Sequence, residues 1–155
     1  MKKQLTHVEA SGRVRMVDVS GKKIVRRRAS ARGYVKMSPA TLKSVVAGQL
    51  AKGDVFNTAR LAGIAGAKRA WDIIPLCHPI PLTSIAVEVE PDPARNRLAI
   101  RSEVVAEART GVEMEALTAV LAAALAIYDM AKAVDKKMEI GGVRLVAKSK
   151  EGLER

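Results

Sequence analysis

Strict alternation over residues 25–37 constrains the fold of this chain more than any other feature. The odd positions carry mainly small or apolar side chains such as Ala29 and Val35, while the even positions carry arginine, serine, tyrosine and lysine. Because successive side chains of a β-strand point to opposite faces, this pattern predicts a long strand with one buried face. The other face of that strand is strongly basic, and we expect it to be solvated.

Five segments in all combine alternating side chains with turn residues at their ends. The expected strands are residues 13–19, 25–37, 85–90, 97–101 and 143–147. Ser20-Gly21-Lys22 predicts a hairpin after the first of these, Pro91-Asp92-Pro93 predicts a second hairpin, and Gly141-Gly142 predicts a turn before the last strand. We expect the tail, residues 148–155, to be solvated.

Three segments carry apolar residues at helical spacing behind a capping signal. The expected helices run over residues 39–48, 55–70 and about 110–134. Ser38 and Asp54 are expected to cap the first two. Thr110-Gly111-Val112-Glu113 has the Ser/Thr-x-x-Glu form of a capping box and opens the third. Between the second and third helices, the prolines of residues 71–81 predict a rigid loop.

After the first strand, the order is strand, helices, strand, strand, helix, strand. This is the β-α-β-β-α-β order of an α+β protein with a ferredoxin-like antiparallel sheet and helices on one face, here with an extra N-terminal strand or hairpin and an extra helix. A length of 155 residues favours a single domain over residues 1–155, with an ordered core at about 5–148. Aromatic residues make up only 3%, so we expect an aliphatic core.

The chain is strongly basic, with 27 Lys and Arg against 16 Asp and Glu and a formal charge of +11. We therefore expect an anionic partner, but net charge does not separate nucleic acid, acidic membranes and phosphorylated small molecules. A single cysteine, Cys77, suits a reducing compartment such as the cytoplasm. The polar residues 1–7 predict no signal peptide, and the uncharged stretch 116–128 is too short to span a membrane.

The Cys77-His78 pair lies between prolines and is a first candidate for chemistry. Zinc needs about four ligands, and the only other histidine is His7, so we predict no metal site. His78 could instead bind an anion or shuttle a proton. A local hydrogen bond in the loop explains it equally well.

Glu113, Met114 and Glu115 occupy the first turn of the long helix. Carboxylates interact favourably with the helix dipole there, which explains them structurally. They could also bind a guanidine-like ring edge through charge-assisted hydrogen bonds.

Two lysine sites can likewise be interpreted either structurally or functionally. Asp129 and Lys132 are neighbours on one helix face, where they form either a surface ion pair or an acid/base couple in which the lysine pKa is lowered. Lys52 stands before Gly53 in a break between helices, where it could reach a phosphate or simply be solvated.

A binding module is the main alternative to an enzyme, because RNA-recognition domains share the β-α-β-β-α-β order. Arg26, Arg28 and Arg32 on the basic strand face would carry RNA affinity. Such modules stack bases on aromatic side chains of the sheet, and the scarcity of aromatics here argues against one. A non-catalytic oligomeric scaffold is a third hypothesis.

Several motifs, in matching order and spacing, closely resemble one family over about residues 5–148. They are Met16-Val17-Asp18-Val19-Ser20, Lys52-Gly53-Asp54-Val55-Phe56, Ile74-Pro75-Leu76-Cys77-His78-Pro79, Gly111-Val112-Glu113-Met114-Glu115-Ala116-Leu117-Thr118 and Ile127-Tyr128-Asp129-Met130. The family is cyclic pyranopterin monophosphate synthase, the molybdenum cofactor biosynthesis protein C. The resemblance implies a cytoplasmic homohexamer of three dimers with a ferredoxin-like fold and active sites at the subunit interface.

The resemblance also implies a reaction. The family converts a cyclic 7,8-dihydro-GTP intermediate to cyclic pyranopterin monophosphate with release of pyrophosphate, a lyase reaction. It implies a small-molecule substrate and neither a nucleic-acid partner nor a membrane. No cofactor or protein-bound metal is implied, although Mg²⁺ could accompany the triphosphate.

By the same resemblance, the catalytic acid/base residues map onto Lys52, Asp129 and Lys132. The substrate-binding positions map onto Leu76, Cys77, His78, Glu113, Met114 and Glu115, with Arg26, Lys68 and Lys148 as phosphate ligands. The sequence departs from the family pattern at Arg109, where a glycine is frequent, at Ala131, where a cysteine is frequent, and in its tail, which lacks the usual glycine-rich segment.

Overall fold

A computed structural model of the chain describes residues 12–153. His7 and the polar segment 1–7 lie outside the described residues, as do the first residues of the expected core. The elements are β1 (Val25–Lys36), α1 (Pro39–Val46), α2 (Val55–Lys68), α3 (Ala70–Ile73), β2 (Leu82–Asp92), the 3₁₀ helix η1 (Pro93–Arg95), β3 (Arg97–Ala108), α4 (Glu113–Ala131) and β4 (Glu139–Glu151).

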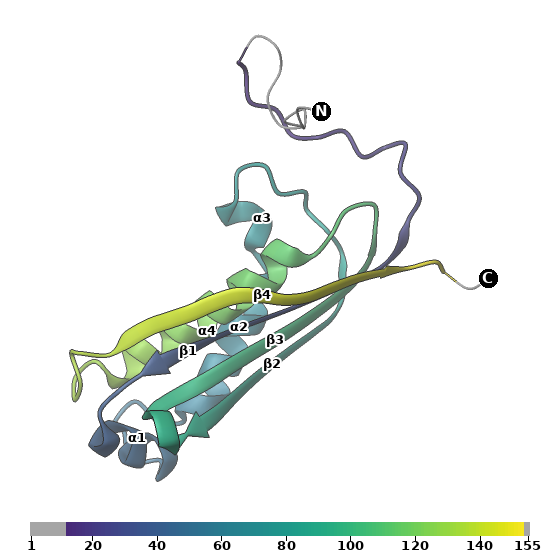
Figure 1. The fold of residues 1–155 in the computed structure, drawn as a ribbon. Helices are drawn as coiled ribbons and strands as arrows, with labels where there is room; N and C mark the ends of the chain where they lie inside the picture. Colours follow the sequence, from purple (N-terminus) through teal and green to yellow (C-terminus); the bar gives the residue numbers. More distant parts are fainter. Residues whose placement is uncertain (1–11, 154–155) are drawn as a thin grey trace.

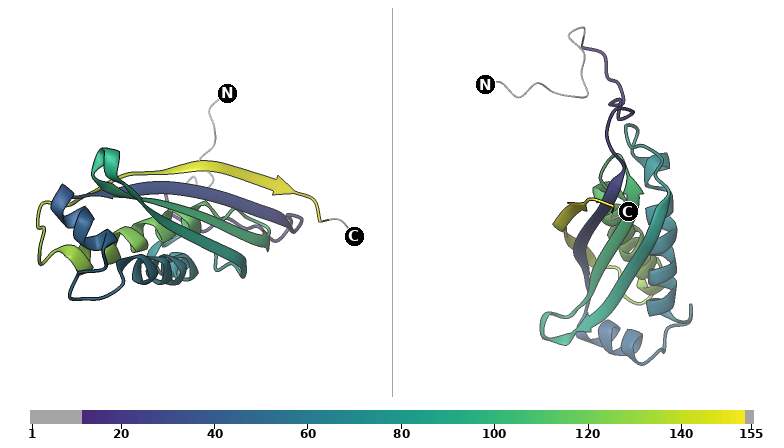
Figure 2. Two further views of the ribbon diagram at one scale, coloured as in Figure 1. Left: turned by 90° about the horizontal axis from the view of Figure 1, so that it is seen from below. Right: turned by 90° about the vertical axis from the view of Figure 1, so that its right-hand side faces the viewer.

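The four strands form one antiparallel sheet in the order β2-β3-β1-β4 (Figure 1). The helices α2 and α4 cover one face of this sheet, so the molecule has two layers (Figure 2). The predicted α+β class and ferredoxin-like topology are therefore confirmed.

The alternation of β1 separates its two faces as predicted. Ala29, Ala31 and Val35 are buried against the helices, whereas the arginines at 26, 28 and 32 are exposed on the outer face. The buried core consists of Ala, Val, Leu, Ile and Met, and its largest fully buried side chains are Leu98, Ile100 and Ile127. Burial of these aliphatic groups drives the packing of the two layers.

Two glycines let α2 approach α4 closely. A Cβ atom on Gly63 would lie 3.0 Å from the Ala119 carbonyl oxygen, and one on Gly66 would lie 2.5 Å from the Ala122 Cβ atom. Both positions therefore require the absence of a side chain. This close contact fixes the position of α2, and of the loop before it, relative to α4.

The predicted caps of the first two helices are present. The Ser38 side chain accepts a hydrogen bond from the Thr41 amide with Pro39 at the first helical position, and the Asp54 side chain accepts one from the Asn57 amide. The capping box predicted for α4 is wrong, because Val112 is the N-cap residue and its side chain makes no capping hydrogen bond. The Glu113 carboxylate instead accepts a hydrogen bond from Lys148 Nζ at 2.9 Å.

The first strand and hairpin predicted at residues 13–19 are also wrong. This segment is irregular apart from a single bridge at Val14. Since β1 is paired with β3 on one side and with β4 on the other, it has no free edge for a preceding hairpin strand.

Smaller differences concern the ends of elements. The loop predicted at 71–81 begins with one helical turn, α3, which ends before Pro75 because proline disfavours helical geometry in the residue before it. The helix α4 ends at Ala131 rather than Val134, and β2 and β3 are both longer than predicted. Hydrogen bonding to neighbouring strands continues past the residues that alternate cleanly.

The Gly141-Gly142 turn is wrong, because both residues lie within β4. The register against β1 shifts between Arg32 and Tyr34, so this site is a β-bulge, and Gly142 has φ +63°. The tail is solvated as predicted over residues 148–153, all of which are exposed, although residues 148–151 also pair with β1 through their backbone.

The helix α4 is long and apolar enough to cross a membrane by length and composition alone. Its residues at positions 116, 119, 120, 123, 124 and 127 are fully buried against the sheet and α2. We therefore assign it as the core helix of a folded domain.

Candidate active site

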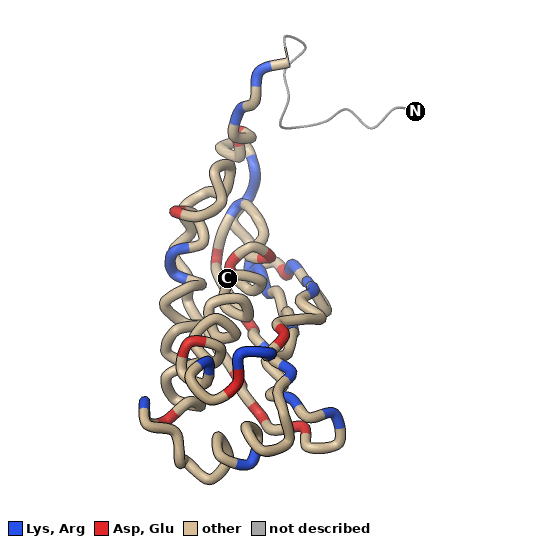
Figure 3. The backbone as a smooth tube through the Cα atoms, turned by 90° about the vertical axis from the view of Figure 1, so that its left-hand side faces the viewer, with Lys and Arg blue, Asp and Glu red and all other residues tan. Residues whose placement is uncertain are grey.

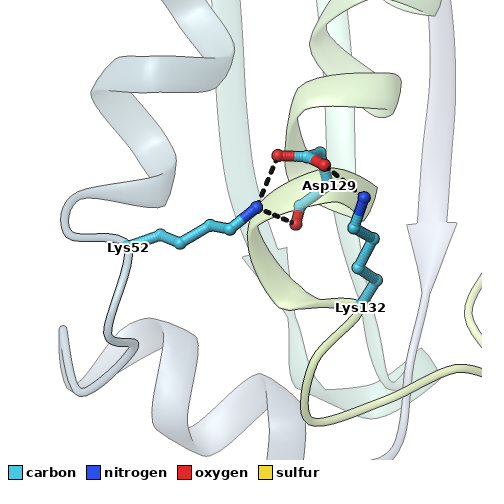
Figure 4. A network of polar contacts seen from close by, with 3 residues as sticks. All are labelled: Lys52, Asp129 and Lys132. Carbon is cyan, nitrogen blue, oxygen red and sulfur yellow. Dashed lines mark hydrogen bonds and ion pairs between the residues drawn. The ribbon is translucent and has the colours of Figure 1, made fainter.

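Two lysines from different parts of the chain meet one carboxylate at the C-terminal end of α4 (Figure 4). Lys52 Nζ donates to Asp129 Oδ2 at 2.7 Å and to the Asp129 carbonyl oxygen at 2.9 Å. Lys132 Nζ lies 2.7 Å from Asp129 Oδ1. The three residues predicted as catalytic therefore form one group, which we call the lysine–aspartate cluster.

Local structure explains how Lys52 arrives there. It lies in the loop between α1 and α2, where Gly53 has φ +91°, a backbone conformation that favours glycine. The Asp54 cap then starts α2, whose two glycines hold it against α4. Packing of α2 against α4 therefore places Lys52 beside the C-terminal end of α4.

The lysine–aspartate cluster is exposed in the single chain, with side-chain exposures of 46% for Lys52 and 56% for Asp129. Hydrogen bonds from Lys132 and then Lys52 lower the pKa of Asp129 to about 2. The hydrogen bond to Asp129 raises the pKa of Lys132. The single chain therefore holds Lys132 as a cation, and the lowered lysine pKa considered from the sequence is not observed.

A second group of predicted residues lies at the other end of α4. A concavity of about 600 Å³ is lined by Leu76, Cys77 and His78 from the proline-rich loop and by Glu113 and Met114 from α4. His78 Nε2 lies 2.8 Å from the Val17 carbonyl oxygen, which ties the irregular segment 12–24 to this loop. We call this the loop concavity.

The two carboxylates at the start of α4 differ in environment. Glu115 is buried, and burial raises its pKa, while Glu115 Oε2 has no hydrogen-bond partner among residues 12–153. Cys77 Sγ lies 3.6 Å from Glu115 Oε1, and burial followed by this carboxylate raises the pKa of the thiol to about 11. Burial acts to raise the pKa of Glu113, but the ion pair with Lys148 lowers it below its usual value.

Sequence reasoning missed Arg27 as a member of this region. Arg27 Nη2 donates to the Arg109 carbonyl oxygen at 3.3 Å, while its buried Nε has no hydrogen-bond partner in the described part of the chain. It lines a basic concavity of about 380 Å³ together with Arg28, Glu113, Lys148 and Lys150. Its odd position in β1, on a face otherwise small or apolar, was the available signal.

The three predicted phosphate ligands are placed differently from one another. Lys148 lines the basic concavity. Arg26 lies on the outer face of the sheet, 3.7 Å from Glu107. Lys68 is exposed at the last residue of α2 and lines neither concavity.

Two of the three arginines on the basic face of β1 are paired with carboxylates. Arg26 pairs with Glu107, and Arg28 pairs with Glu103. Lys and Arg are spread along the whole length of the molecule rather than gathered in one segment (Figure 3). Within residues 12–153, no group of three His, Cys, Asp or Glu side chains could hold a metal ion.

The lysine–aspartate cluster and the loop concavity are far apart within one chain. Glu113 and Asp129 stand near the two ends of α4, and at about 1.5 Å per helical residue their Cα atoms are roughly 24 Å apart. The two groups therefore occupy separate regions of the single chain.

These features define an α+β protein of ferredoxin-like topology with acid/base and cationic groups at both ends of a buried core helix. The model of the MoaC family matches residues 16–151 of the chain. The chain belongs to the MoaC family.

Its relatives share most of their length with it. It is 57% identical over 145 residues to the cyclic pyranopterin monophosphate synthase of Pelotomaculum thermopropionicum, covering 94% of this chain and 85% of the relative. The protein of the same name from Roseiflexus sp. is also 57% identical over 145 residues, covering 94% and 92%. That of Brucella ovis is 54% identical over 149 residues, covering 96% and 90%.

Proposed function

We propose that the chain is a cyclic pyranopterin monophosphate synthase, an enzyme of molybdenum cofactor biosynthesis. Its substrate is (8S)-3',8-cyclo-7,8-dihydroguanosine 5'-triphosphate, and its products are cyclic pyranopterin monophosphate and pyrophosphate. This makes it a lyase that acts in the cytoplasm and needs no cofactor held by the protein.

The lysine–aspartate cluster is the observation that carries this proposal. Lys52 Nζ and Lys132 Nζ each lie 2.7 Å from a carboxylate oxygen of Asp129. The family resemblance assigns acid/base catalysis to these three positions, which come from two distant segments of the chain. An ordinary surface ion pair within one helix involves two residues and no partner from another element. The convergence of Lys52 on Asp129 is therefore more informative than the Asp129–Lys132 spacing alone.

The reaction needs proton transfers and a sink for phosphate charge. When a hydroxyl of the substrate attacks the α-phosphorus, a new P–O bond forms, the bond to the β-phosphate breaks, and the hydroxyl proton must be accepted. Asp129 is ionised at neutral pH, so its carboxylate accepts this proton, and the ammonium groups of the two lysines that it orients stabilise charge that develops on the phosphates and the leaving pyrophosphate.

The other end of α4 supplies recognition groups. Glu113 and Glu115 are suited to the guanidine-like edge of the pterin ring, and Arg27, Lys148 and Lys150 to the triphosphate.

Because the two ends of α4 are roughly 24 Å apart, we propose that each active site combines groups from two chains within a homohexamer. An antiparallel pair of α4 helices related by a two-fold axis at Leu121 would bring Asp129 of one chain beside Glu113 of the other. Apolar positions on α4 support this axis, since the partly buried Leu117 and the exposed Leu125 are equidistant from Leu121 in sequence. Leu121 and Leu125 are 43% and 61% exposed in the single chain.

A disulfide cross-link tests this pairing. Leu121→Cys places a thiol on the two-fold axis, so mild oxidation is expected to give a covalent dimer in high yield. Leu61→Cys, at a leucine of α2 that is 68% exposed, is the matched control and should cross-link poorly. Equal yields from both variants would contradict the α4 pairing without bearing on the reaction itself.

A single-turnover assay tests the reaction. The purified protein is mixed with the enzymatically generated cyclic dihydro-GTP intermediate, with and without Mg²⁺, and pyrophosphate and oxidised pterin fluorescence are followed. Stoichiometric product from the wild type and none from Lys132→Ala supports the assignment. Absence of product from folded wild-type protein would overturn it.

A further inference from the structure

The outer face of the sheet, opposite the helices, carries three arginines in register. Arg32 on β1 lies directly opposite Arg101 on β3 and directly opposite Arg144 on β4. All three residues are exposed. Like charges directly opposite each other across a sheet are destabilising, so this row opposes folding unless something neutralises it.

Side chains of the protein neutralise this arginine row only in part. Glu88 on β2 lies opposite Arg101 in the register. In the described part of the chain, none of the three arginines forms an ion pair with a carboxylate. On the same strand, by contrast, Arg28 lies 2.6 Å from Glu103.

A concavity of about 370 Å³ lies over the arginine row. Among the residues that the structure describes, its charged lining consists of five arginines and no acidic residue, namely Arg32, Arg95, Arg97, Arg101 and Arg144. We call it the arginine concavity. Its volume falls at the small end of the range typical of small-ligand sites.

The β-bulge of β4 shapes the arginine concavity. A Cβ atom on Gly142 would lie 2.6 Å from Tyr34 Cε1, so the glycine leaves room for the tyrosine ring beside it. The Arg97 guanidinium lies over that ring, 4.8 Å from its centre. Asp92 Oδ2 holds Arg97 and Arg95 at 2.9 Å and 3.2 Å, so these two side chains are oriented by the protein.

We propose that the arginine concavity binds a polyphosphate anion, either pyrophosphate or the phosphate chain of a nucleoside triphosphate. Guanidinium groups match phosphate oxygens in bidentate geometry, and a multiply charged anion would relieve the repulsion along the row. Arg32 is four residues from Arg28, which lines the basic concavity, a separation of roughly 13 Å along β1, and the two concavities share no lining residue. The site is therefore separate from the basic concavity near Glu113, and it does not depend on the proposed reaction.

Thermal unfolding at low ionic strength tests this proposal with Arg32→Gln and, in case that variant folds poorly, Arg101→Gln. The matched control is Lys36→Gln, which removes one charge from the same face of β1 but does not line the concavity. Without added anion, Arg32→Gln is expected to raise Tm by roughly 1–3 °C, because it relieves like-charge repulsion. A residue with a purely structural role would lower Tm when replaced.

Sodium pyrophosphate and GTP serve as probes, with sodium sulfate at equal ionic strength as the screening control. Both probes are expected to raise the Tm of the wild type and of Lys36→Gln by more than they raise that of Arg32→Gln. Equal shifts from both probes assign the site to the phosphate chain, and a larger shift from GTP assigns it to a nucleotide. An undiminished pyrophosphate shift in both Arg32→Gln and Arg101→Gln would overturn the proposal.

Discussion

Gly66→Ala tests the claim that close contact between α2 and α4 positions the lysine–aspartate cluster. The added Cβ atom would lie 2.5 Å from Ala122 Cβ and 3.2 Å from the Thr118 carbonyl oxygen. Neither atom belongs to a flexible side chain, so one helix must move. Overpacking of this kind costs about 2–3 kcal/mol, and the better helix propensity of alanine offsets about 1 kcal/mol.

The net loss of about 1–2 kcal/mol should lower Tm by roughly 3–6 °C in a chain of this length. Since Lys52 lies in the loop before α2, a shift of the helix also moves Lys52 away from Asp129. Misplacement by about 1 Å can reduce turnover by as much as 100-fold. Differential scanning calorimetry and the single-turnover assay measure the two effects.

Gly21→Ala is the matched control, because nothing lies within 4 Å of its added Cβ atom and its φ is not in the left-handed region. Its Tm and turnover should stay close to those of the wild type. A Gly66→Ala protein as stable and as active as the wild type would refute the packing argument.

Two further predictions follow from the environments of Asp129 and Cys77. Because the two lysines lower the pKa of Asp129 from 3.8 to about 2, its charged form stabilises the fold above its ordinary pKa, and this contribution is lost as the pH falls from 3.8 to about 2. The Tm difference between wild type and Asp129→Asn should therefore vanish across that window in acid unfolding scans; a constant difference would contradict the ion pairs. Because the pKa of Cys77 is raised from 9.0 to about 11, iodoacetamide at pH 8 should alkylate it roughly 100-fold more slowly than a free thiol. Alkylation at the rate of a free thiol would contradict its burial beside Glu115.

Much of the fold could be predicted because local signals agree with the tertiary structure. The alternation of β1, the Ser38 and Asp54 caps and the apolar spacing of α4 all survive in the structure. The failures have a common origin in tertiary pairing. Residues 13–19 alternate like a strand, but both edges of β1 are already occupied.

The capping box and the Gly141-Gly142 turn failed for related reasons. Glu113 pairs with Lys148 from β4, a partner that no local pattern reveals. The two glycines serve a β-bulge beside Tyr34 rather than a chain reversal. Sequence spacing cannot distinguish a glycine needed for a turn from one needed for close approach.

The candidate site was also predicted only in part. Motif resemblance supplied Lys52, Asp129 and Lys132, and the structure brings the three together. Motif resemblance did not identify Arg27. An arginine on the inner face of a strand breaks the alternating pattern, but the sequence does not show which concavity it lines. The predicted helix over about 110–134 already separates Glu113 from Asp129, but spacing could not show that Lys52 joins one end of α4 and the Cys77-His78 loop joins the other.

Complementation between inactive variants is the most direct test of an active site shared by two chains. Lys132→Ala removes a group at one end of α4, and Glu115→Gln alters the other end, so each variant alone should be inactive in the single-turnover assay. If sites form between two-fold-related chains, co-expression with random pairing leaves about a quarter of the sites with both native groups. The account predicts recovery of about a quarter of wild-type product from the co-expressed chains, and no recovery from assembled mixed oligomers would contradict it.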